Sequence, residues 1–395
     1  MTQRGRRVLI AGGGIGGLAA AIALGLRGRD VALLERSTFG DETGAGIQLG
    51  PNATRALRAL GVLEAIEHAA SKPEAIWLFD GLSGRRLASM PLGTHAETRY
   101  GAPYLTLHRA DLHAALLAAC QASGSVELKS GFEVTTIRQH EGHIVADSLD
   151  GGDIEGEALI GADGLWSAVR KLIDPQARLR FAGATASRTL LPRAGLPAPF
   201  DAPVVGLWLG PKAHLVHYPV HSGNNLNIVA VTEGGIEEQG WSQASDTSAL
   251  LSSFANWCKE SKSLLDKASG WRSWSLYRLP PLPRWSAGRV ALLGDAAHPV
   301  QPFLAQGAAL AVEDALTLAA ALDSQPDDPS AAFARYAASR QARTARVQAL
   351  SQRFGRIYHL SGPMRLARNF ILERRGEEAA LARFDWLYGF GAARD

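Results

Sequence analysis

The chain has little cysteine and little net charge, and each shortage excludes a class of protein. The two cysteines among 395 residues, Cys120 and Cys258, stand in apolar surroundings and form no CxxC or Cys/His spacing. This pattern offers no structural zinc site and no disulfide framework, and it favours a reducing, cytoplasmic location. A formal net charge of +3, with basic and acidic residues interspersed, predicts no nucleic-acid partner.

The sequence also lacks a segment suited to a membrane, although one stretch looks like one at first. Residues 8–26, VLIAGGGIGGLAAAIALGL, carry no charge and follow a basic start, as in a signal peptide or an anchor. Five of the six residues from Gly12 to Gly17 are glycine, and each glycine costs a helix about 1 kcal/mol. The residues after Leu26 are charged and form no cleavage site. We therefore predict no association with a membrane.

The same stretch fits a strand, a glycine-rich turn and a helix. RVLIAG is β-branched and aliphatic, whereas IGGLAAAIALGLRGR is rich in alanine and leucine. The turn between them reads G-x-G-x-x-G, which lets a pyrophosphate approach the backbone at the amino end of a helix. The next strand ends in Glu35, which suits a ribose hydroxyl, and Arg36 beside it is a candidate for the adenine or a solvated charge. The predicted dinucleotide site includes Gly12, Gly14, Ile15, Gly16 and Gly17.

Length and pattern predict more than one structural unit. Short strands and helices alternate up to about residue 179, a proline-rich β stretch follows from Arg180 to about Trp274, and the last 65 residues read as helical. Six of the nine tryptophans lie between Trp208 and Trp285, which predicts a β layer with a large apolar surface. AIWLFD and RRLASM read as a hairpin, and Gly50–Ile66 reads as helical.

Besides the amino-terminal glycines and HRADLH, four segments stand out: GAGIQLGPNA (Gly44–Ala53), GADGLWSAVR (Gly161–Arg170), RVALLGDAAHP with FLAQGAALAVEDA (Arg289–Ala315), and RFDWLYGF (Arg383–Phe390). With this set of motifs the whole chain resembles the single-component (class A) flavin monooxygenases that hydroxylate aromatic acids. Salicylate, 3-hydroxybenzoate and 6-hydroxynicotinate hydroxylases belong to this family. The specific motif is the GD segment, RVALLGDAAHP with Gly294 and Asp295, because G-x-G-x-x-G is shared by NAD and FAD proteins.

The resemblance implies an α/β fold like that of p-hydroxybenzoate hydroxylase. In that fold a Rossmann-like FAD-binding domain carries an inserted β-sheet substrate domain and a helical carboxyl-terminal region. We expect the discontinuous FAD-binding domain in residues 1–71, 101–179 and 281–330. The substrate domain is expected in residues 72–100 and 180–280, and the helical region in residues 331–395.

The resemblance also implies which residues hold FAD. Asp295 follows the buried strand VALLG and needs a partner, which in the family is a hydroxyl of the ribityl chain. Gly307 opens a helix whose N–H groups could approach the flavin ring and stabilise negative charge on it. Arg109 would contact the phosphate or ribityl region. Asp163 would lie near the pyrophosphate, with Arg170 for charge balance, or would only close a turn. Further residues expected at the cofactor are Gln48, Gly294 and Ala308.

The implied activity is hydroxylation of a small phenolic or hydroxypyridine carboxylic acid through a flavin C4a-hydroperoxide, with O2 and with NADH or NADPH. Because no second G-x-G-x-x-G is present, the reductant is expected to bind transiently. One alternative is a flavin monooxygenase of this architecture that acts on a quinone precursor, an isoprenoid or a polyketide. Another is an NAD-dependent dehydrogenase or a non-catalytic dinucleotide-binding protein. A monomer and a homodimer both stay open.

The segment KAHLVHYPVHSG, residues 212–223, holds the candidates for a catalytic base. Strand alternation places His214 and Tyr218 on one face and His217 on the other. The three histidines, with His221, therefore do not converge, and we predict no metal. His214 and Tyr218 resemble the substrate-side pair of the 3-hydroxybenzoate and 6-hydroxynicotinate enzymes, and either could take a phenolic proton. The alternative is a core pair satisfied by the backbone. We expect His217 to be exposed or hydrogen-bonded.

Two local features concern the substrate side. Pro299 and Pro302 stiffen the loop HPVQPF, which the resemblance places beside the reactive edge of the flavin; alternatively the loop is rigid and has no contact with substrate. Ser187, followed by Arg188 and Thr189, stands where many members of the family carry tryptophan. The lost aromatic area predicts an enlarged or reshaped substrate layer.

Overall fold

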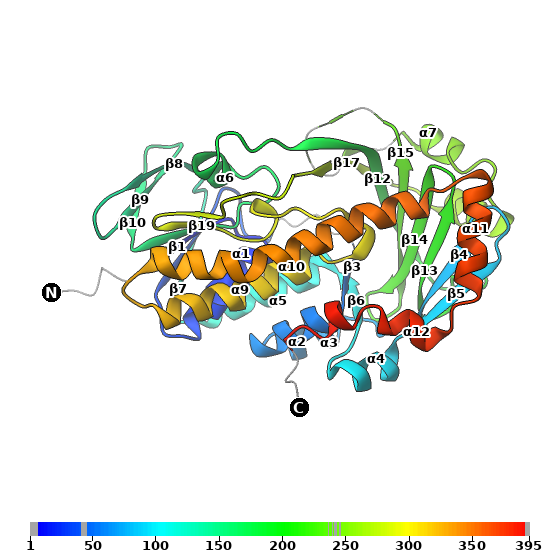
Figure 1. The fold of residues 1–395 in the computed structure, drawn as a ribbon, viewed down its shortest axis with the longest axis horizontal. Helices are drawn as coiled ribbons and strands as arrows, with labels where there is room; N and C mark the ends of the chain where they lie inside the picture. The colour runs from blue at the N-terminus through cyan, green and yellow to red at the C-terminus, as the bar shows by residue number, and fades with distance from the viewer. Residues whose placement is uncertain are drawn as a thin grey trace.

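Two large sheets lie toward opposite ends of the structure, and the long helix α10 (Pro329–Tyr358) runs from one toward the other (Figure 1). The computed structural model describes residues 7–40, 46–235, 237–238, 240, 243–244 and 246–391. Gly44, Ala45 and Trp241, which belong to the segments and the tryptophan count above, lie outside these residues.

The first sheet has the strand order β18-β19-β11-β1-β2-β7 and is parallel apart from the edge strand β18. Its central strand β1 is fully buried because helices cover the sheet, which explains its uninterrupted apolar sequence. The strands are β1 Val8–Ala11, β2 Val31–Glu35, β7 Val126–Ser130, β11 Ala158–Gly161, β18 Ser286–Ala287 and β19 Val290–Leu292. The helices packed beside it are α1 Ile15–Gly25, α5 Arg109–Ala122 and α9 Gly307–Ser324.

The second sheet has the order β16-β17-β12-β15-β14-β13-β4-β5 and is antiparallel except where β4 pairs with β13. The short helices α7 and α8 share an apolar core with one face, while α10, α11 and α12 lie over the other (Figure 1). The strands are β4 Ala75–Asp80, β5 Arg86–Pro91, β12 Arg180–Pro192, β13 Val204–Gly210, β14 Ala213–Val220, β15 Asn225–Glu233, β16 Gln243–Ala244 and β17 Arg272–Arg278. The covering helices are α7 Thr247–Ser252, α8 Lys259–Lys267, α11 Gly362–Glu373 and α12 Glu377–Ala382.

Smaller elements connect these layers. One antiparallel sheet contains β8 Val134–Gln139, β9 Ile144–Ser148 and β10 Asp153–Gly156, and another pairs β3 Gly46–Leu49 with β6 Leu105–His108. Strand β6 leads directly into α5, so it places the amino end of that helix. The remaining elements are α2 Pro51–Ala59, α3 Leu63–Glu67, α4 Gly93–Tyr100, α6 Ala168–Ile173, α13 Asp385–Tyr388 and the 3₁₀ turns η1 Gly294–Ala296 and η2 Pro302–Leu304.

The predicted α/β architecture with a helical carboxyl-terminal region is confirmed, and the predicted hairpin is β4–β5. The segment Gly50–Ile66, which reads as helical, forms two helices, because α2 ends at Ala59 and Gly61 adopts a φ of +72° before α3 begins. A left-handed glycine commonly ends a helix in this way. None of the described helices has the length and hydropathy needed to cross a bilayer. The proposed division into domains stays a prediction.

Candidate active site

The glycine turn after β1 combines close packing with open space. Gly12 adopts a φ of +108°, and a Cβ atom on it would overlap the backbone of Ala162. A Cβ on Gly17 would overlap the carbonyl oxygen of Gly12, and one on Gly16 would lie 2.8 Å from Leu293 Cδ2. In contrast, a Cβ on Gly14 would meet no atom within 4 Å. The turn therefore packs tightly inward and leaves its outer side free for a ligand, as a dinucleotide turn requires.

A cleft of about 450 Å³ extends from this turn along the carboxyl ends of the parallel strands. Ligands of doubly wound α/β sheets bind at this position. The predicted cofactor residues that line the cleft are Gly12, Gly14, Glu35, Arg36, Arg109, Asp163 and Asp295. Ile15, Gly16 and Gly17 pack beneath it, whereas Gln48 lines a second cavity. Gly294 lies in η1, and Gly307 and Ala308 lie at the start of α9; none of the three is among the described lining residues of either hollow.

Glu35 ties the end of β2 to the glycine turn. One of its oxygens accepts a hydrogen bond from Gly13 N (2.7 Å), and the other accepts bonds from the Ser37 N–H (2.9 Å) and hydroxyl (2.8 Å). An ionised carboxylate has about four acceptor positions. Glu35 therefore keeps capacity for a ribose hydroxyl.

Asp295 is the acid whose surroundings indicate a missing partner. Its carboxylate lines the cleft and forms no hydrogen bond with any described residue. Burial raises its pKa, and the charges of His298, Arg109 and Arg170 partly oppose this shift. A carboxylate that is partly withdrawn from water and has no donor loses hydration without compensation. The residues present thus fit the predicted FAD, which offers the hydroxyls of its ribityl chain.

Asp163 has a structural task of its own. Its carboxylate accepts hydrogen bonds from the Ser167 hydroxyl (2.5 Å) and from the backbone N–H groups of Ala168 (2.7 Å) and Val169 (3.0 Å). Burial raises its pKa, and these bonds oppose the shift. The geometry favours the alternative that Asp163 closes the turn before α6. Arg170 is near enough to interact with its charge.

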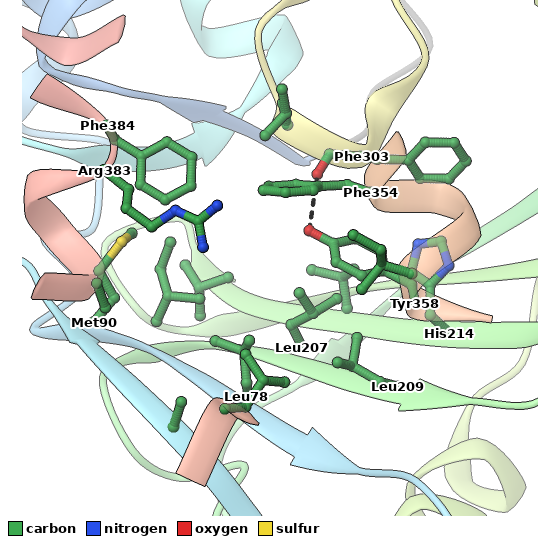
Figure 2. A pocket seen from close by; sticks show the side chains of 18 of the residues that line it. Leu78, Met90, Leu207, Leu209, His214, Phe303, Phe354, Tyr358, Arg383 and Phe384 are labelled. Atoms are coloured by element: carbon green, nitrogen blue, oxygen red, sulfur yellow. Dashed lines mark hydrogen bonds between the residues drawn. The ribbon is translucent and has the colours of Figure 1, made fainter. Parts of the chain in front are cut away.

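The second hollow is a cavity of about 630 Å³ between the eight-stranded sheet and α10–α12 (Figure 2). Leu78, Met90, Leu207 and Leu209 line it from the sheet, and Phe303, Phe354, Tyr358 and Phe384 line it from the opposite side. Four arginines also line it, and no acidic residue does so within the described part of the chain; these are Arg353, Arg368, Arg375 and Arg383. The cavity is therefore apolar with a positive potential.

His214 and Tyr218 lie on the same face of β14, as predicted, but only His214 lines the cavity. His214 is 2% exposed, and burial together with the nearby His359 places its pKa well below the usual value. Burial raises the pKa of the Tyr218 hydroxyl, and a hydrogen bond with Gln48 opposes part of this shift. The Tyr104 hydroxyl also donates to Gln48 Oε1 (2.8 Å). Tyr218 thus reaches the cavity through the Gln48 amide.

The expectation for His217 was wrong. Its side chain is fully buried, and neither ring nitrogen has a hydrogen-bond partner among the described residues. The ring packs edge-on against Phe200, with centroids 5.0 Å apart, and beside Trp208. Strand alternation identified the correct face, but α7 and α8 cover that face as well. Burial lowers the pKa of His217 to about 3, so the ring is neutral at pH 7.

The three histidines of the segment do not converge, as expected. His221 instead lies beside His108, with ring centroids 4.8 Å apart, and its Nε2 is 4.0 Å from Asp111 Oδ2. The potential ligand atoms of His108, Asp111 and His221 lie within 4.8 Å of one another. All three are partly exposed, and His221 Nδ1 is hydrogen-bonded to Asn225 (3.1 Å). The absence of a metal stays a prediction.

The loop from Pro299 to Phe303 is held by one side of α10. Gln348 Nε2 donates to the Pro299 carbonyl (3.0 Å), and the Ser351 hydroxyl donates to the Gln301 carbonyl (2.7 Å). The Tyr358 hydroxyl donates to the Phe303 carbonyl (3.2 Å; Figure 2). Of the two prolines, Pro302 lines the cavity. The sequence analysis missed these three donors, because polar residues spaced three and seven positions apart place them on one side of a helix but do not indicate which carbonyls they bind.

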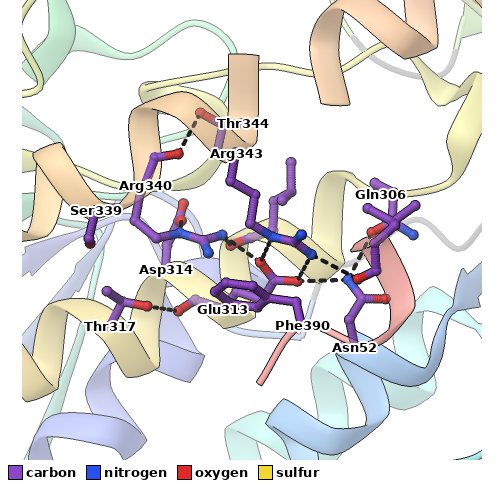
Figure 3. A network of polar contacts seen from close by, with 12 residues as sticks. Asn52, Gln306, Glu313, Asp314, Thr317, Ser339, Arg340, Arg343, Thr344 and Phe390 are labelled. Atoms are coloured by element: carbon purple, nitrogen blue, oxygen red, sulfur yellow. Dashed lines mark hydrogen bonds and ion pairs between the residues drawn. The ribbon is translucent and has the colours of Figure 1, made fainter. Parts of the chain in front are cut away.

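A buried ionic network joins α9 to α10 (Figure 3). Arg340 donates to Asp314 (2.6 Å) and to Glu313 (2.7 Å), and Arg343 donates to both oxygens of Glu313 (2.8 and 2.7 Å). His298 Nε2 lies 2.5 Å from Asp314 Oδ2. Because His298 follows the GD segment, the network fixes that segment relative to both helices.

The terminal segment RFDWLYGF closes the same network. The Arg343 guanidinium donates to the carbonyls of Trp386 and Leu387 (both 3.0 Å) and lies 4.0 Å from the centroid of the Phe390 ring. Tyr388 of this segment lines the cavity. The segment therefore connects the ionic network with the cavity wall.

Ser187, the departure from the family pattern, lies buried in β12 opposite Ser273 and Ala230. It is absent from the described linings of both hollows. Its neighbour Arg188 lines the cleft and lies over the Trp274 ring, 5.2 Å from the centroid. The side chain at position 187 can therefore change the shape of the cavity only indirectly, through the packing of the sheet.

Comparison with known proteins agrees with this geometry. The family described as FAD binding domain matches residues 6–351. The chain is 39% identical over 383 residues to 3-hydroxybenzoate 6-hydroxylase of Polaromonas naphthalenivorans (strain CJ2), which covers 97% of this chain and 96% of that protein. It is 36% identical over 390 residues to 3-amino-4-hydroxybenzoate 2-monooxygenase of Streptomyces cremeus, with 98% and 96% covered.

A solved structure gives the same result. Klebsiella pneumoniae HpxO complexed with FAD and uric acid is similar with a TM-score of 0.87 and 25% identity, over 98% of this chain and 97% of that one. The region that the family matches, residues 6–351, contains the glycine turn, the GD segment and the whole eight-stranded sheet. The chain therefore belongs to the family of FAD-dependent aromatic hydroxylases and is a flavoprotein monooxygenase.

Proposed function

We propose that this enzyme hydroxylates a small phenolic or hydroxypyridine carboxylic acid, using O2 and NADH or NADPH. The observation that carries the proposal is the second cavity, where a neutral histidine lines apolar walls beside the loop that follows the GD segment. The two relatives are named for hydroxybenzoates, which supports an aromatic acid as the substrate. Bound FAD supplies the activation of oxygen, and the residues of the chain bind, orient and deprotonate the substrate.

The charge of the cavity favours an anionic substrate. Arg353, Arg375 and Arg383 line it and form no ion pair with any described residue. Burial and the neighbouring Arg383 lower the pKa of Arg375, so the site would gain from a negative charge. A cleft lined by one sign of charge raises the local concentration of the opposite ion. A carboxylate on the substrate provides that charge.

His214 is the proposed base. Electrophilic hydroxylation needs an electron-rich ring, which a phenol provides best after it loses its proton. Because burial keeps His214 neutral, its imidazole can accept that proton. The raised pKa of Tyr218 keeps its hydroxyl protonated, which suits a hydrogen-bond donor. We therefore assign proton abstraction to His214 and orientation of substrate, through Gln48, to Tyr218.

The proposed FAD contacts follow the cleft. Gly12 and Gly14 would face the pyrophosphate, Glu35 the ribose and Asp295 the ribityl chain. A Cβ on Gly307 would meet no atom within 4 Å, so a flavin ring has room at the start of α9, beside Ala308. Apolar side chains and the braced Pro302 loop limit water at the reacting centre.

A substrate panel tests the proposal. The purified protein should be yellow, and 3-hydroxybenzoate, 3-amino-4-hydroxybenzoate or 6-hydroxynicotinate should raise NAD(P)H consumption and yield an equal amount of hydroxylated product by mass spectrometry. Hydroxylation of a quinone precursor, an isoprenoid or a polyketide, with no phenolic acid accepted, would favour the alternative substrate class instead.

Two further expectations belong to this proposal. We propose a cytoplasmic location, which the cysteine usage supports, since both thiols are buried and free. The chain forms a monomer or a homodimer, which light scattering at the working concentration distinguishes.

A further inference from the structure

His214 is the first member of a hydrogen-bonded series that leaves the cavity. Its Nδ1 lies 2.8 Å from His359 Nε2, and His359 Nδ1 lies 2.9 Å from Glu233 Oε1. His359 follows the last residue of α10, and Glu233 ends β15. The side chain of His359 is 5% exposed, whereas that of Glu233 is 46% exposed. The series therefore connects a buried cavity residue with a carboxylate that water can reach.

The carboxylate determines the tautomers along the series. An ionised carboxylate can only accept, so His359 carries its proton on Nδ1 and donates it to Glu233. Burial is the largest influence on the His359 pKa and lowers it, aided by Arg368 and opposed by Glu233. The neutral ring consequently presents a lone pair at Nε2, to which His214 Nδ1–H donates. The free lone pair of His214 is then at Nε2, which has no hydrogen-bond partner among the described residues.

We propose that His214, His359 and Glu233 form a proton path that carries the hydroxyl proton of the bound substrate from the cavity to solvent. The inference rests on the proposed function. It adds His359 and Glu233 as positioning and proton-transferring residues that do not touch the substrate.

Each step transfers one proton between neighbouring groups. No step needs an oxidant or a reductant. The substrate O–H bond breaks, its electron pair stays on the oxygen as a phenolate, and an N–H bond forms at His214 Nε2. The Nδ1 proton of His214 passes to His359 Nε2, and the Nδ1 proton of His359 passes to a Glu233 oxygen. Glu233 then releases this proton to water. Rotation of the two rings, or return transfer of protons from solvent, restores the starting tautomers.

Among the described residues, the polar groups beside this path are hydrogen-bonded to other partners and do not divert the proton. The ring of Tyr358 packs against His214, with centroids 5.4 Å apart, but its hydroxyl donates to the Phe303 carbonyl. Arg368 donates to the carbonyls of Ile357 (3.1 Å) and Tyr358 (2.8 Å) and to the Asn369 side chain. Lys212 contributes its backbone N–H to the His359 carbonyl (3.3 Å). The cation of Arg368 disfavours a proton that stays on His359, so it favours onward transfer to Glu233.

The test compares Glu233→Gln and His359→Gln with wild-type FAD enzyme and with Glu141→Gln, which removes the same charge at an exposed position in the turn between β8 and β9. Glutamine can occupy the hydrogen-bonded positions but cannot take up and pass on a proton. The bound phenolic acid is titrated from pH 5 to 9, and its phenolate absorbance is followed in the oxidised, non-turning-over complex. Product formation is measured over the same range.

We expect both path variants to lower product formation at pH 7 at least tenfold. The pH at which half of the bound substrate is phenolate should rise by one or more pH units, while FAD content and substrate affinity change less than threefold. Glu141→Gln should match wild type. In His359→Ala, added imidazole should restore part of the rate. Because Glu233 is half exposed, its variant retains the fold even if His359→Gln does not.

The proton path would be overturned if Glu233→Gln and His359→Gln both showed the wild-type rate of product formation and the wild-type titration of the bound phenol. It would also be overturned if imidazole did not rescue His359→Ala. In both cases the proposed function would stand. If the wild-type enzyme hydroxylates no phenolic acid, the proposed function itself fails. The two failures are therefore distinguishable.

Discussion

The carbonyl oxygen of Gly12 occupies the position that a Cβ atom of Gly17 would need. Gly17 is therefore required by the protein itself, because it lets α1 approach β1. Gly14, in the same turn, has open space where its Cβ would be and a φ of −75° that any residue can adopt. Its glycine is required only if a ligand lies there.

This contrast yields the first prediction. Gly17→Ala should lower the free energy of unfolding of the flavin-free protein by about 1–3 kcal/mol, through overpacking. Gly14→Ala should leave that stability unchanged and weaken FAD binding at least tenfold. Thermal unfolding and titration with FAD followed by flavin fluorescence measure the two effects. Equal FAD affinity in Gly14→Ala and wild type would mean that the pyrophosphate does not bind at this turn.

The second prediction concerns Asp295. Asp295→Ala should lose FAD during purification, because the ribityl hydroxyls lose their acceptor. The ratio of flavin absorbance to protein absorbance reports the loss. Asp323→Ala, at an exposed position of α9, is the matched control and should keep full flavin content. Full retention of flavin in Asp295→Ala would contradict the ribityl role.

The third prediction separates the proposed roles of His214 and Tyr218 from the binding of the cofactor. His214→Ala should lower product formation at least tenfold, because the phenol keeps its proton. Tyr218→Phe should lower the yield of product per NAD(P)H and raise hydrogen peroxide release, because the substrate is held less well. Flavin content should stay at the wild-type level in both. Wild-type hydroxylation rates in both variants would show that this pair has no part in the chemistry.

The fourth prediction uses the buried His217. Its pKa is lowered from 6.5 to about 3 in the folded state, so unfolding takes up a proton between these values. The stability from this group is complete above pH 6.5 and is lost as the pH falls, by about 2 kcal/mol between pH 7 and pH 5. His217→Leu also removes two buried unpaired nitrogens and should stabilise the protein by about 1–2 kcal/mol at pH 7.

Urea unfolding at pH 7 and pH 5 checks this. The stabilisation by His217→Leu should be larger at pH 5. An equal difference at both pH values would mean that His217 is not kept neutral by the fold.

The fifth prediction concerns the network of Figure 3. Asp314→Asn should destabilise the protein by about 3–5 kcal/mol, because it removes one of the two buried carboxylates that pair with the Arg340 guanidinium, Glu313 being the other. Arg340→Met combined with Asp314→Leu should restore much of this loss, since the buried cation that lost this partner is gone. Guanidinium unfolding curves of the three proteins measure it. If the double variant is as unstable as Asp314→Asn, the loss arises from packing rather than from charge.

The cofactor cleft could be predicted largely from the sequence because its requirements are local. A tight turn needs glycine at Gly12 and Gly17, and an acid after a buried strand needs a partner, as Asp295 does. Both requirements can be read from short segments. Strand alternation also assigned His214 and Tyr218 to one face correctly, since that property depends only on neighbouring residues in β14.

The rest depended on contacts between distant segments. His359 and Glu233 are separated by 126 positions in the sequence, and nothing local indicates that they meet. The environment of His217 could not be predicted, because periodicity identifies a face of a strand but not what covers it. Gln348, Ser351 and Arg343 read as ordinary polar positions of a helix until the loop carbonyls and the terminal segment that they bind are known.

Helix α10 imposes one geometric condition on the whole enzyme. Its thirty residues span about 45 Å at 1.5 Å per residue. Arg340 and Arg343 anchor the helix beside the GD segment, and His359 follows its far end. Inserting a single residue in between would turn His359 by about 100° relative to Arg340 and advance it by about 1.5 Å. The number of residues between Arg340 and His359 therefore determines how the proposed proton path is positioned relative to the GD segment. We expect natural length variation to be absent from this part of α10 and to be tolerated in the loops at either end.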